Sequence, residues 1–415
     1  MATRADSGSR QLRQRNTVDD VRKNNLAIVL GIAHLSGRVS RAELTRATGL
    51  NRSTIGALAA ELVELGLVEE HDPGARSHAG RPSPIIAPRD DVVAIAVNPE
   101  IDAVTIGLVS LSGRVLKRIR YNTARVPSVE EVVNIVAAVV AGMRGELDSS
   151  FHTVGVGVAV PGIVRERTGE VILAPHLGWH DVPFAEMLSA ALELPVTAEN
   201  DASAGVIAES SFGAGRAVRN LIYLNGGASG IGGGIAINGA LLTGASGYAG
   251  EFGHTLVNSV GSLCHCGATG CLETEVSRAP LLSVLGLGDA ESDNLEALLL
   301  EQFARAGGPN AEVRELVHRQ VDFLAVALKD IVNGLNPELV LFGGFLGTLY
   351  AAAPQRLEAA VRGASIVGPR DDVRFARAEL GLDLLMVGAA ELAFAPLLAD
   401  PAGVMGPAVD TVAEA

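Results

Sequence analysis

The apolar positions near the start of the chain fall at helical spacing. They run from Val18 to Leu35 with Asn25 as the one polar interruption, and Gly37 follows the last of them. A helix brings residues three or four positions apart onto one face, and glycine is common just past a helix end. We therefore predict a helix over about 18–35, carrying the apolar stripe Val18, Val21, Ile28, Ile32 and Leu35.

Two further helices are predicted next. Ser40 and Glu43 have the spacing of a capping box, which opens a short helix. Asn51 is a second N-cap, followed by an apolar stripe that runs to Leu65. This order of helices predicts a helix-turn-helix, in which the first residues of the third helix reach base edges in the major groove. The candidate DNA contacts are Arg52, Ser53 and Thr54, with plain helix initiation as their alternative role.

Two short strands are expected after the third helix, over 67–70 and 83–86, on either side of a loop with Gly and Pro. Such a pair makes the wing of a winged helix-turn-helix. Within the loop, Gly80-Arg81-Pro82 holds Arg81 on a stiff backbone, which suits entry into a minor groove; a surface turn is the alternative. We expect a flexible arm over 1–16 and a DNA-binding domain over 17–89.

After Pro88 the pattern changes to aliphatic runs of strand length, and a second strand-rich series begins at Leu221. Two similar openings predict a duplicated α/β unit with a cleft between its halves. The strands of the first series are expected at 92–97, 104–109, 114–118 and 153–160, with a helix near 129–143. The expected boundaries are 90–210 for the first lobe, 211–398 for the second and 399–415 for a disordered tail.

Charge is distributed unevenly along the chain. Residues 1–89 hold 13 Lys+Arg and 9 Asp+Glu, a net charge of +4, which leaves −18 for the remainder because the total is −14. A basic head on an acidic body suggests that only the head meets nucleic acid. The uncharged run 221–250 is long enough to span a membrane, but its ten glycines and short alternating apolar groups favour buried strands and turns. We therefore expect no membrane segment there.

All three cysteines lie within eight positions, at Cys264, Cys266 and Cys271, and His254 precedes them. Three thiolates and one imidazole complete a tetrahedral set with no open position, which predicts a structural zinc. His265 competes as the fourth ligand. We favour His254 because its second ring nitrogen would stay free to face a ligand. A disulfide is the weaker explanation, since three cysteines cannot all pair within one chain.

The motif around the cysteines is long and mixed in composition. Glu251-x-Gly253-His254, followed by Cys264-x-Cys266-Gly267-x-x-Gly270-Cys271-x-Glu273, resembles the signature of the ROK family of repressors, open reading frames and kinases, over roughly 92–398. The resemblance implies an actin-like, ribonuclease H-like sugar-kinase fold of two lobes, with the zinc loop at 254–271. It also implies that sugar hydroxyls bind at Gly162, Asn200, Asp201, Glu251, His254 and Glu273.

A kinase of this family needs a first phosphate loop of the form Asp-x-Gly-Gly-Thr. Here the loop begins at Asn98 in place of the aspartate, Glu100 replaces a glycine, and Pro99 removes an amide donor. A carboxylate facing a triphosphate is repulsive, so we expect no ATP binding and assign no catalytic residues. The second loop, 226–232, keeps its glycines. An ATP-dependent sugar kinase with a DNA-binding head is therefore the alternative hypothesis.

These features predict a cytoplasmic, sugar-responsive transcriptional regulator of carbohydrate genes, most simply a repressor, whose degenerate kinase domain acts as the sensor. The expected partners are operator DNA, a sugar or sugar-phosphate effector and further copies of the chain. A homodimer or homotetramer is expected because helix-turn-helix proteins usually read two half-sites. A protein of a sugar-uptake system is an alternative signal. Zinc is the expected cofactor.

Overall fold

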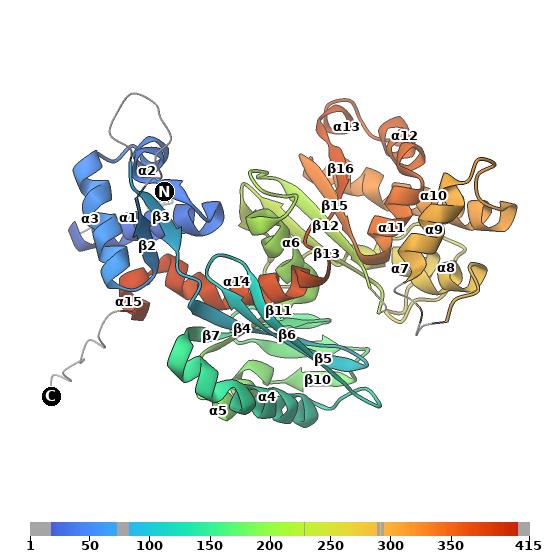
Figure 1. Cartoon of the computed structure of the whole chain (residues 1–415). Helices are drawn as coiled ribbons and strands as arrows, with labels where there is room; N and C mark the ends of the chain where they lie inside the picture. Colours follow the sequence, from blue (N-terminus) through green and yellow to red (C-terminus); the bar gives the residue numbers. More distant parts are fainter. Residues whose placement is uncertain (1–17, 73–82, 228, 289–290, 292–293, 406–415) are drawn as a thin grey trace, which may run out of the picture. The chain divides into compact units, whose positions relative to one another are not determined.

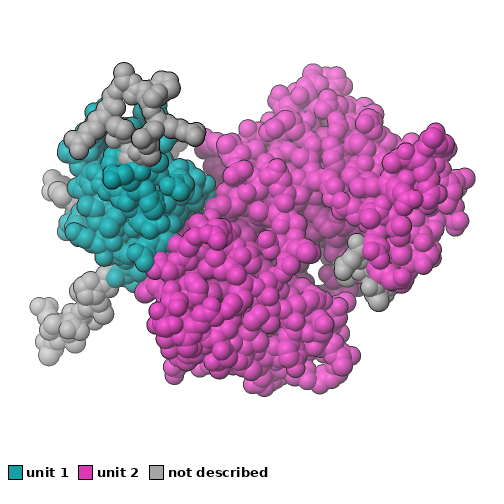
Figure 2. Space-filling view, in the orientation of Figure 1, with its two compact units in different colours: residues 1–89, 396–415 teal, residues 90–395 magenta. Residues whose placement is uncertain are grey.

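The computed structural model describes residues 18–72, 83–227, 229–288, 291 and 294–405. The chain forms two compact units, which Figure 2 draws in different colours. Unit 1 combines residues 1–89 with 396–415, and unit 2 is residues 90–395.

Unit 1 contains the predicted helices and a small sheet (Figure 1). The helices are α1 (Val18–Ser36), α2 (Arg41–Thr48) and α3 (Arg52–Glu64), and the strands are β1 (Val39–Ser40), β2 (Val68–His71) and β3 (Ile85–Pro88). The sheet order is β1-β3-β2, and β3 is antiparallel to both neighbours. The two wing strands are present, each with bounds shifted toward the C-terminus. The two-residue strand β1 was not predicted.

Side-chain caps set the starts of α2 and α3. The backbone amide of Glu43 donates to Ser40 Oγ at 3.2 Å and the amide of Ser40 donates to Glu43 Oε2 at 2.8 Å, so the predicted capping box is confirmed. Asn51 Oδ1 accepts from the amide of Thr54 at 2.9 Å, which confirms the second N-cap. Gly49 ends α2 at φ 73°, a conformation that favours glycine.

Three members of the apolar stripe that predicts α1 lie outside the core. The helix itself is confirmed, but its buried apolar side chains come from another face: Leu26, Val29, Leu30 and Ala33. Val21, Ile28 and Leu35 are instead 49%, 42% and 48% exposed. Both faces of α1 are apolar, so helical spacing alone could not identify the face that packs.

The C-terminal segment differs from its prediction. Pro401–Met405 form the helix α15, where we predicted a disordered tail, and Pro401 is buried. This helix packs against α1, and Lys23 Nζ lies 3.7 Å from Asp400 Oδ2. Small apolar side chains and these contacts hold the segment in unit 1, so the boundary predicted at 398 is also displaced, to about 395. The predictions for residues 1–16 and 406–415 lie outside the described residues.

Two five-stranded sheets dominate unit 2, and they share one topology. The first has the order β11-β7-β4-β5-β6 and the second β14-β13-β12-β15-β16, with an antiparallel three-strand meander on one side and parallel strands on the other. The identical order bears out the predicted duplication. In the first half the strands are β4 (Val92–Pro99), β5 (Ala103–Ser110), β6 (Val115–Asn122), β7 (His152–Val160) and β11 (Val196–Asn200). In the second they are β12 (Leu221–Gly226), β13 (Ile231–Ile237), β14 (Ala240–Leu241), β15 (Leu339–Gly343) and β16 (Arg374–Arg377).

Helices cover the sheets of unit 2, and a small third sheet of order β10-β9-β8 lies beside the first (Figure 1). Its strands are β8 (Ile163–Arg165), β9 (Glu170–Ala174) and β10 (Trp179–Val182). The helices of the first half are α4 (Val129–Ser150), α5 (Phe184–Leu192) and α6 (Asp201–Phe212). Those of the second are α7 (Leu272–Glu275), α8 (Arg278–Val284), α9 (Leu295–Ala304), α10 (Ala311–Leu335), α11 (Gly344–Ala352), α12 (Pro354–Ala364) and α13 (Pro369–Asp372), and α14 (Leu384–Ala399) follows them in the chain.

The helix α14 packs tightly onto the first sheet. A Cβ on Gly157 in β7 would lie 1.6 Å from the carbonyl oxygen of Ala389, so only glycine permits this approach. Among the described helices, the segment Gly381–Ala399 is long and apolar enough to cross a membrane by length and composition. Of its 18-residue apolar stretch, 61% is buried, as expected of a core helix, so this segment is weak evidence for a membrane span.

Candidate functional site

Three parallel strands of the first sheet, β4, β7 and β11, end at one edge. Ligands of α/β sheets bind at the carboxyl ends of such strands. β11 ends at Asn200, and its side chain is well occupied: Oδ1 accepts from the amides of Ala202 and Ser203 and so caps α6, while Nδ2 donates to the carbonyl of Gly162 at 2.9 Å. Asn200 therefore joins the end of β11 to the turn after β7.

Gly162 lies where no larger residue fits. A Cβ there would lie 2.5 Å from the carbonyl oxygen of Leu173 and 2.8 Å from Cα of Ala174. The glycine thus lets the turn after β7 pack against β9, and its own carbonyl receives the Asn200 amide. The predicted sugar residues Gly162 and Asn200 are brought into direct contact.

Asp201 begins α6 directly after this contact. Burial raises the pKa of its carboxyl to about 6; the hydrogen bond from the Ala202 amide opposes the rise, and the Glu251 carboxylate adds to it. Asp201 Oδ1 lies 3.9 Å from where a Cβ on Gly232 would be, so the carboxyl group faces β13 of the second half. Near neutral pH this group can accept hydrogen bonds and can also take up a proton.

The predicted metal ligands converge. The ligand atoms of His254, Cys264, Cys266 and Cys271 all lie within 4.8 Å of one another. Cys266 Sγ and Cys271 Sγ are 3.7 Å apart, and His254 Nδ1 lies 3.6 Å from Cys264 Sγ. Tetrahedral zinc bonds of about 2.3 Å to sulfur and about 2.0–2.1 Å to nitrogen place ligands about 3.8 Å (S–S) and about 3.6 Å (N–S) apart. These four side chains therefore fit a tetrahedral metal.

The competing ligand, His265, lies beside this cluster. Its Nδ1 is 3.9 Å from Cys264 Sγ and 3.1 Å from Glu273 Oε1, and its side chain is 47% exposed. It groups with His254 and Glu273 rather than with the three cysteines. The geometry thus favours His254, whose Nδ1 faces the sulfurs and leaves Nε2 on the other side of the ring.

The backbone of the cysteine loop is fixed by glycines and by one glutamate. Gly270 has φ 76°, and a Cβ on it would lie 1.6 Å from the carbonyl oxygen of Asn258. Glu275 accepts hydrogen bonds from Asn258 Nδ2 at 3.0 Å and from the Ser262 amide at 2.9 Å. The close approach of Gly270 to Asn258 and the two hydrogen bonds to Glu275 therefore fix the backbone of the loop, and this places the thiols where they could bind one metal ion. The role of Glu275 was not predicted, because nothing in its spacing distinguishes it from a surface glutamate.

Glu251 and Glu273 both interact with His254. Glu273 is 10% exposed, with its Oε1 3.5 Å from His254 Nδ1, and its Oε2 packs against the backbone at Gly230 and Gly253. Desolvation raises the pKa of Glu251, with His254 lowering it and the Glu273 carboxylate raising it again. Asp201, Glu251, His254 and Glu273 thus form one interacting set, which we call the acceptor cluster. Figure 2 shows unit 2 hollowed between its two halves.

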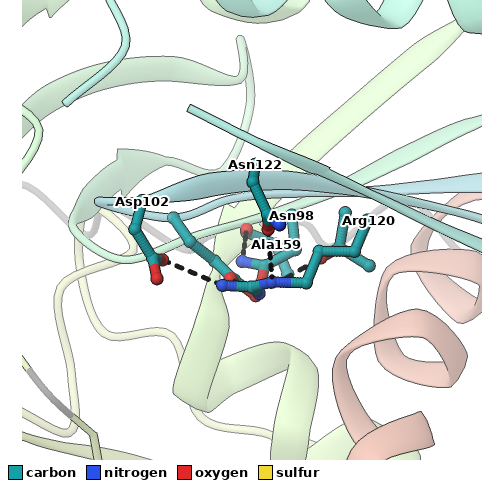
Figure 3. A network of polar contacts seen from close by, with 7 residues as sticks. Asn98, Asp102, Arg120, Asn122 and Ala159 are labelled. Atoms are coloured by element: carbon teal, nitrogen blue, oxygen red, sulfur yellow. Dashed lines mark hydrogen bonds and ion pairs between the residues drawn. The ribbon is translucent and has the colours of Figure 1, made fainter. Parts of the chain in front are cut away.

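The turn between β4 and β5 is closed by an ion-pair network (Figure 3). Arg120 on β6 contacts the Glu100 carboxylate, and its other nitrogen lies 2.9 Å from Asp102. Asn98 donates to the carbonyl of Ala159 at 2.9 Å and is 3% exposed. Burial raises the pKa of Glu100, and Arg120 opposes that rise. We call these four residues the phosphate-loop network, after the position that the sequence resemblance assigns to this turn.

The glycine-rich second loop follows β12. Gly226 pairs with Ile231, and Gly230, at φ 137°, would clash with Glu273 Oε2 at 2.4 Å if it carried a Cβ. This glycine is therefore needed for the close approach of the acceptor cluster, whether or not it meets phosphate.

Sequence reasoning missed two buried or bridging groups. Glu199 is 3% exposed, and burial raises its pKa to about 7, with the amide of Asn200 lowering it and Glu166 raising it. Arg120 was missed because it lies 20 residues from Glu100 on another strand; only the register that pairs it with Thr105 brings it to the turn.

Three histidine rings lie in series beside the metal ligands. The ring centroid of His265 lies 5.1 Å from that of His254 and 6.1 Å from that of His176, and His176 lines a surface cavity of about 610 Å³.

The predicted DNA contacts lie at the start of α3. Arg52 and Ser53 are exposed and Thr54 is half-buried. Ser53 Oγ donates to Asn51 Oδ1 at 2.6 Å, so this hydroxyl takes part in helix initiation. Arg81 lies outside the described residues.

Comparison with known proteins defines the class. Residues 95–395 match the ROK family. A xylose repressor of Caldicellulosiruptor bescii is 30% identical over 325 residues, which are 75% of this chain and 81% of that protein. A solved ROK family transcriptional regulator, a homolog of the E. coli MLC protein, has TM-score 0.74 at 22% identity and covers 93% of this chain and 98% of its own. A ROK family glucokinase of Streptomyces griseus, solved with glucose and AMPPNP, has TM-score 0.60 at 29% identity, over 72% of this chain and 98% of its own.

A two-lobed α/β sugar-kinase-like domain with a helical N-terminal unit is thus the class of protein that fold and site define. The chain belongs to the ROK family. The resemblance read from the cysteine motif is thereby confirmed, and so is the fold class.

Proposed function

We propose that this protein is a sugar-responsive, DNA-binding transcriptional regulator, acting as a repressor, in which the kinase-like domain senses the sugar. The observation that carries the proposal is the contrast between the acceptor cluster, where several carboxylates interact around His254, and the phosphate-loop network, where Arg120 pairs with Glu100 and Asp102. The repressor function named for the C. bescii relative supports it. So does the glucokinase comparison, which spans nearly all of that kinase but leaves over a quarter of this chain unmatched.

The acceptor cluster suits a sugar. Three carboxylates and an imidazole accept hydrogen bonds from a ligand that is mostly hydroxyl donors, and bonds to charged groups contribute about 1.5–3 kcal/mol each. Asn200 holds the turn at Gly162 and retains one amide hydrogen for the ligand. The name of the C. bescii relative makes D-xylose the first sugar to test, with glucose and sugar phosphates after it.

We propose structural zinc as the metal, held by His254, Cys264, Cys266 and Cys271. A bound zinc would fix the imidazole of His254 through Nδ1 and leave Nε2 to face a sugar hydroxyl. The four ligands leave no open position for a metal-bound water, so the metal serves structure rather than chemistry. Support comes from the tetrahedral spacing of the ligand atoms.

For DNA recognition we propose the start of α3, with Arg52, Ser53 and Thr54 toward base edges and Arg81 toward a minor groove. The protein is expected in the cytoplasm, as a homodimer or homotetramer on paired half-sites. Sugar binding would shift the population between arrangements of the two lobes, and so of the paired DNA-binding units. A protein of a sugar-uptake system stays an alternative effector.

Fluorescence anisotropy with DNA from immediately upstream of the protein's own gene tests this function. We expect sequence-selective binding that weakens as salt rises and that D-xylose, or another aldose of a panel, releases. Arg52→Ala should weaken binding, whereas Arg362→Ala, an exposed arginine on α12, should leave it unchanged. Binding equal to that of scrambled DNA at every salt concentration would contradict the proposal.

The alternative, an ATP-dependent sugar kinase that carries a DNA-binding head, rests on one specific observation. Burial raises the pKa of Asp201 to about 6, which suits a general base near neutral pH. The glycines of the second loop favour it too. The ion pairs at Glu100 disfavour it, because a nucleotide phosphate there would meet carboxylates instead of backbone amides.

A further inference from the structure

An apolar stripe runs along α1, with three of its five members exposed and the other two half-buried. Its members are Val21, Asn25, Ile28, Ile32 and Leu35, spaced by four, three, four and three residues. Val21, Ile28 and Leu35 are 49%, 42% and 48% exposed, although each is a large aliphatic residue. Single exposed apolar residues are ordinary, but a continuous row along four turns of one helix marks an interaction surface.

The charged residues of α1 lie off this stripe. Arg22 pairs with Glu61 on α3 at 3.0 Å, and Lys23 lies 3.7 Å from Asp400. No stripe position carries a charge, and Asn25 is its one polar member. The surface is therefore suited to a second apolar helix rather than to nucleic acid or to an acidic peptide.

The spacing is that of a coiled-coil seam. Alternating steps of four and three residues place Val21, Ile28 and Leu35 at d positions and Asn25 and Ile32 at a positions of a heptad. A single asparagine at an a position pairs with the same residue of a parallel partner helix, which sets register and limits the assembly to two strands. Against an unrelated apolar surface, the amide of Asn25 would instead be buried without a partner.

The heptad spacing and Asn25 indicate which partner binds the stripe on α1. The residues before α1 offer only Met1 and Leu12 as large apolar side chains, too few to cover the stripe. A second copy of α1 has the same apolar stripe in the same register. It also places an asparagine opposite Asn25. We propose that α1 is a contact between two copies of this chain, with the two helices parallel and Asn25 facing Asn25 of the second copy.

This contact goes beyond the proposed function, because it assigns a surface for pairing and does not depend on DNA or sugar. It would fix the separation of two α3 helices within a dimer. The α1 contact is compatible with a second contact between the two copies through unit 2.

Site-specific photo-crosslinking of the full-length protein tests the contact. Val21 and Leu35 are each replaced, in separate preparations, by p-benzoylphenylalanine, and Val63, which is 40% exposed on α3, serves as the matched control. We expect a dimer band on a denaturing gel from positions 21 and 35 and none from position 63. Peptide mapping should join each position to its own neighbourhood on α1 of the second copy.

A second variant separates pairing from misfolding. Ile28→Asp places a carboxylate in the middle of the stripe on an already exposed position, so the unit should fold while the dimer band from position 35 is lost; Val63→Asp should leave that band intact. Cross-links from 35 to residues 90–395 or 1–17 of the same chain, to the region of 21 on a second copy, or to no protein at all would each overturn the proposal. Loss of DNA binding with the dimer band intact would count against the proposed function only.

Discussion

The acceptor cluster and the phosphate-loop network each include a residue that follows a parallel strand of the first sheet, Asp201 after β11 and Glu100 after β4, yet they are built in opposite ways. At the end of β11, the Asn200 side chain caps α6 and donates to the carbonyl of Gly162, and the carboxyl group of Asp201 beside it is left to accept hydrogen bonds from a ligand. At the end of β4, Glu100 is already paired with Arg120. In the proposed function, the first arrangement leaves acceptors for sugar hydroxyls, and the second puts a paired carboxylate where a nucleotide phosphate would need donors.

Metal loss should have the largest effect and should act on the acceptor cluster alone. Cys266 is exposed, so Cys266→Ser leaves no cavity, yet it removes one of four ligands. We expect loss of bound zinc by elemental analysis and a lower free energy of unfolding by several kcal/mol, since structural zinc contributes about 10–16 kcal/mol in small domains. His265→Ala is the matched control and should keep one zinc per chain. Full zinc occupancy in Cys266→Ser would contradict the assigned ligand set.

The pH dependence of stability should be the next largest effect. Burial raises the pKa of Glu199 to about 7 and that of Asp201 to about 6, so the stability that each contributes is present below its unfolded pKa and is lost as pH rises through those values. Thermal unfolding should therefore show a less stable protein at pH 8 than at pH 5. Glu199→Gln keeps the acceptor for the Asn200 amide and removes the charge. It should reduce the difference in stability between pH 5 and pH 8 by up to about 3 kcal/mol, and an unchanged difference would show that Glu199 is solvated.

The affinity for sugar should depend on the acceptor cluster and not on the phosphate-loop network. Glu273→Gln removes a charged acceptor while preserving shape, and should weaken binding of D-xylose or the best aldose by roughly 10–100-fold, or about 1.5–3 kcal/mol, in calorimetric titration. Glu100→Gln, the same change within the phosphate-loop network, should leave that affinity unchanged. Equal losses in both variants would mean that the two regions act as one site.

The phosphate-loop network should contribute least. Arg120 is 44% exposed, so its ion pairs are screened by water, and Arg120→Ala should lower stability by about 1 kcal/mol or less in denaturant unfolding. Arg114→Ala breaks another exposed pair of the same sheet, with Asp90, and should behave alike. A loss of more than about 3 kcal/mol from Arg120→Ala alone would show that the network is essential for the fold rather than a replacement for phosphate contacts.

The sequence predicted what depends on local spacing. The Ser40–Glu43 cap, the strands that open each sheet and the convergence of His254 with three cysteines follow from residues close together in the chain. Two features depend on packing between distant segments and could not be predicted this way. Arg120 reaches Glu100 only through the pairing of β5 with β6, and the buried face of α1 is chosen by α2, α3 and the sheet of unit 1.

The most direct test of the account is a coupled assay for ADP release by the full-length, zinc-loaded protein, with Mg-ATP and a panel of aldoses, beside Asp201→Asn. The account predicts that wild type and Asp201→Asn release ADP equally, at the background rate, with every sugar, including one that calorimetry shows to bind. Sugar-dependent turnover by the wild type that disappears in Asp201→Asn would contradict it, because the phosphate-loop network would then admit ATP and Asp201 would act as a base.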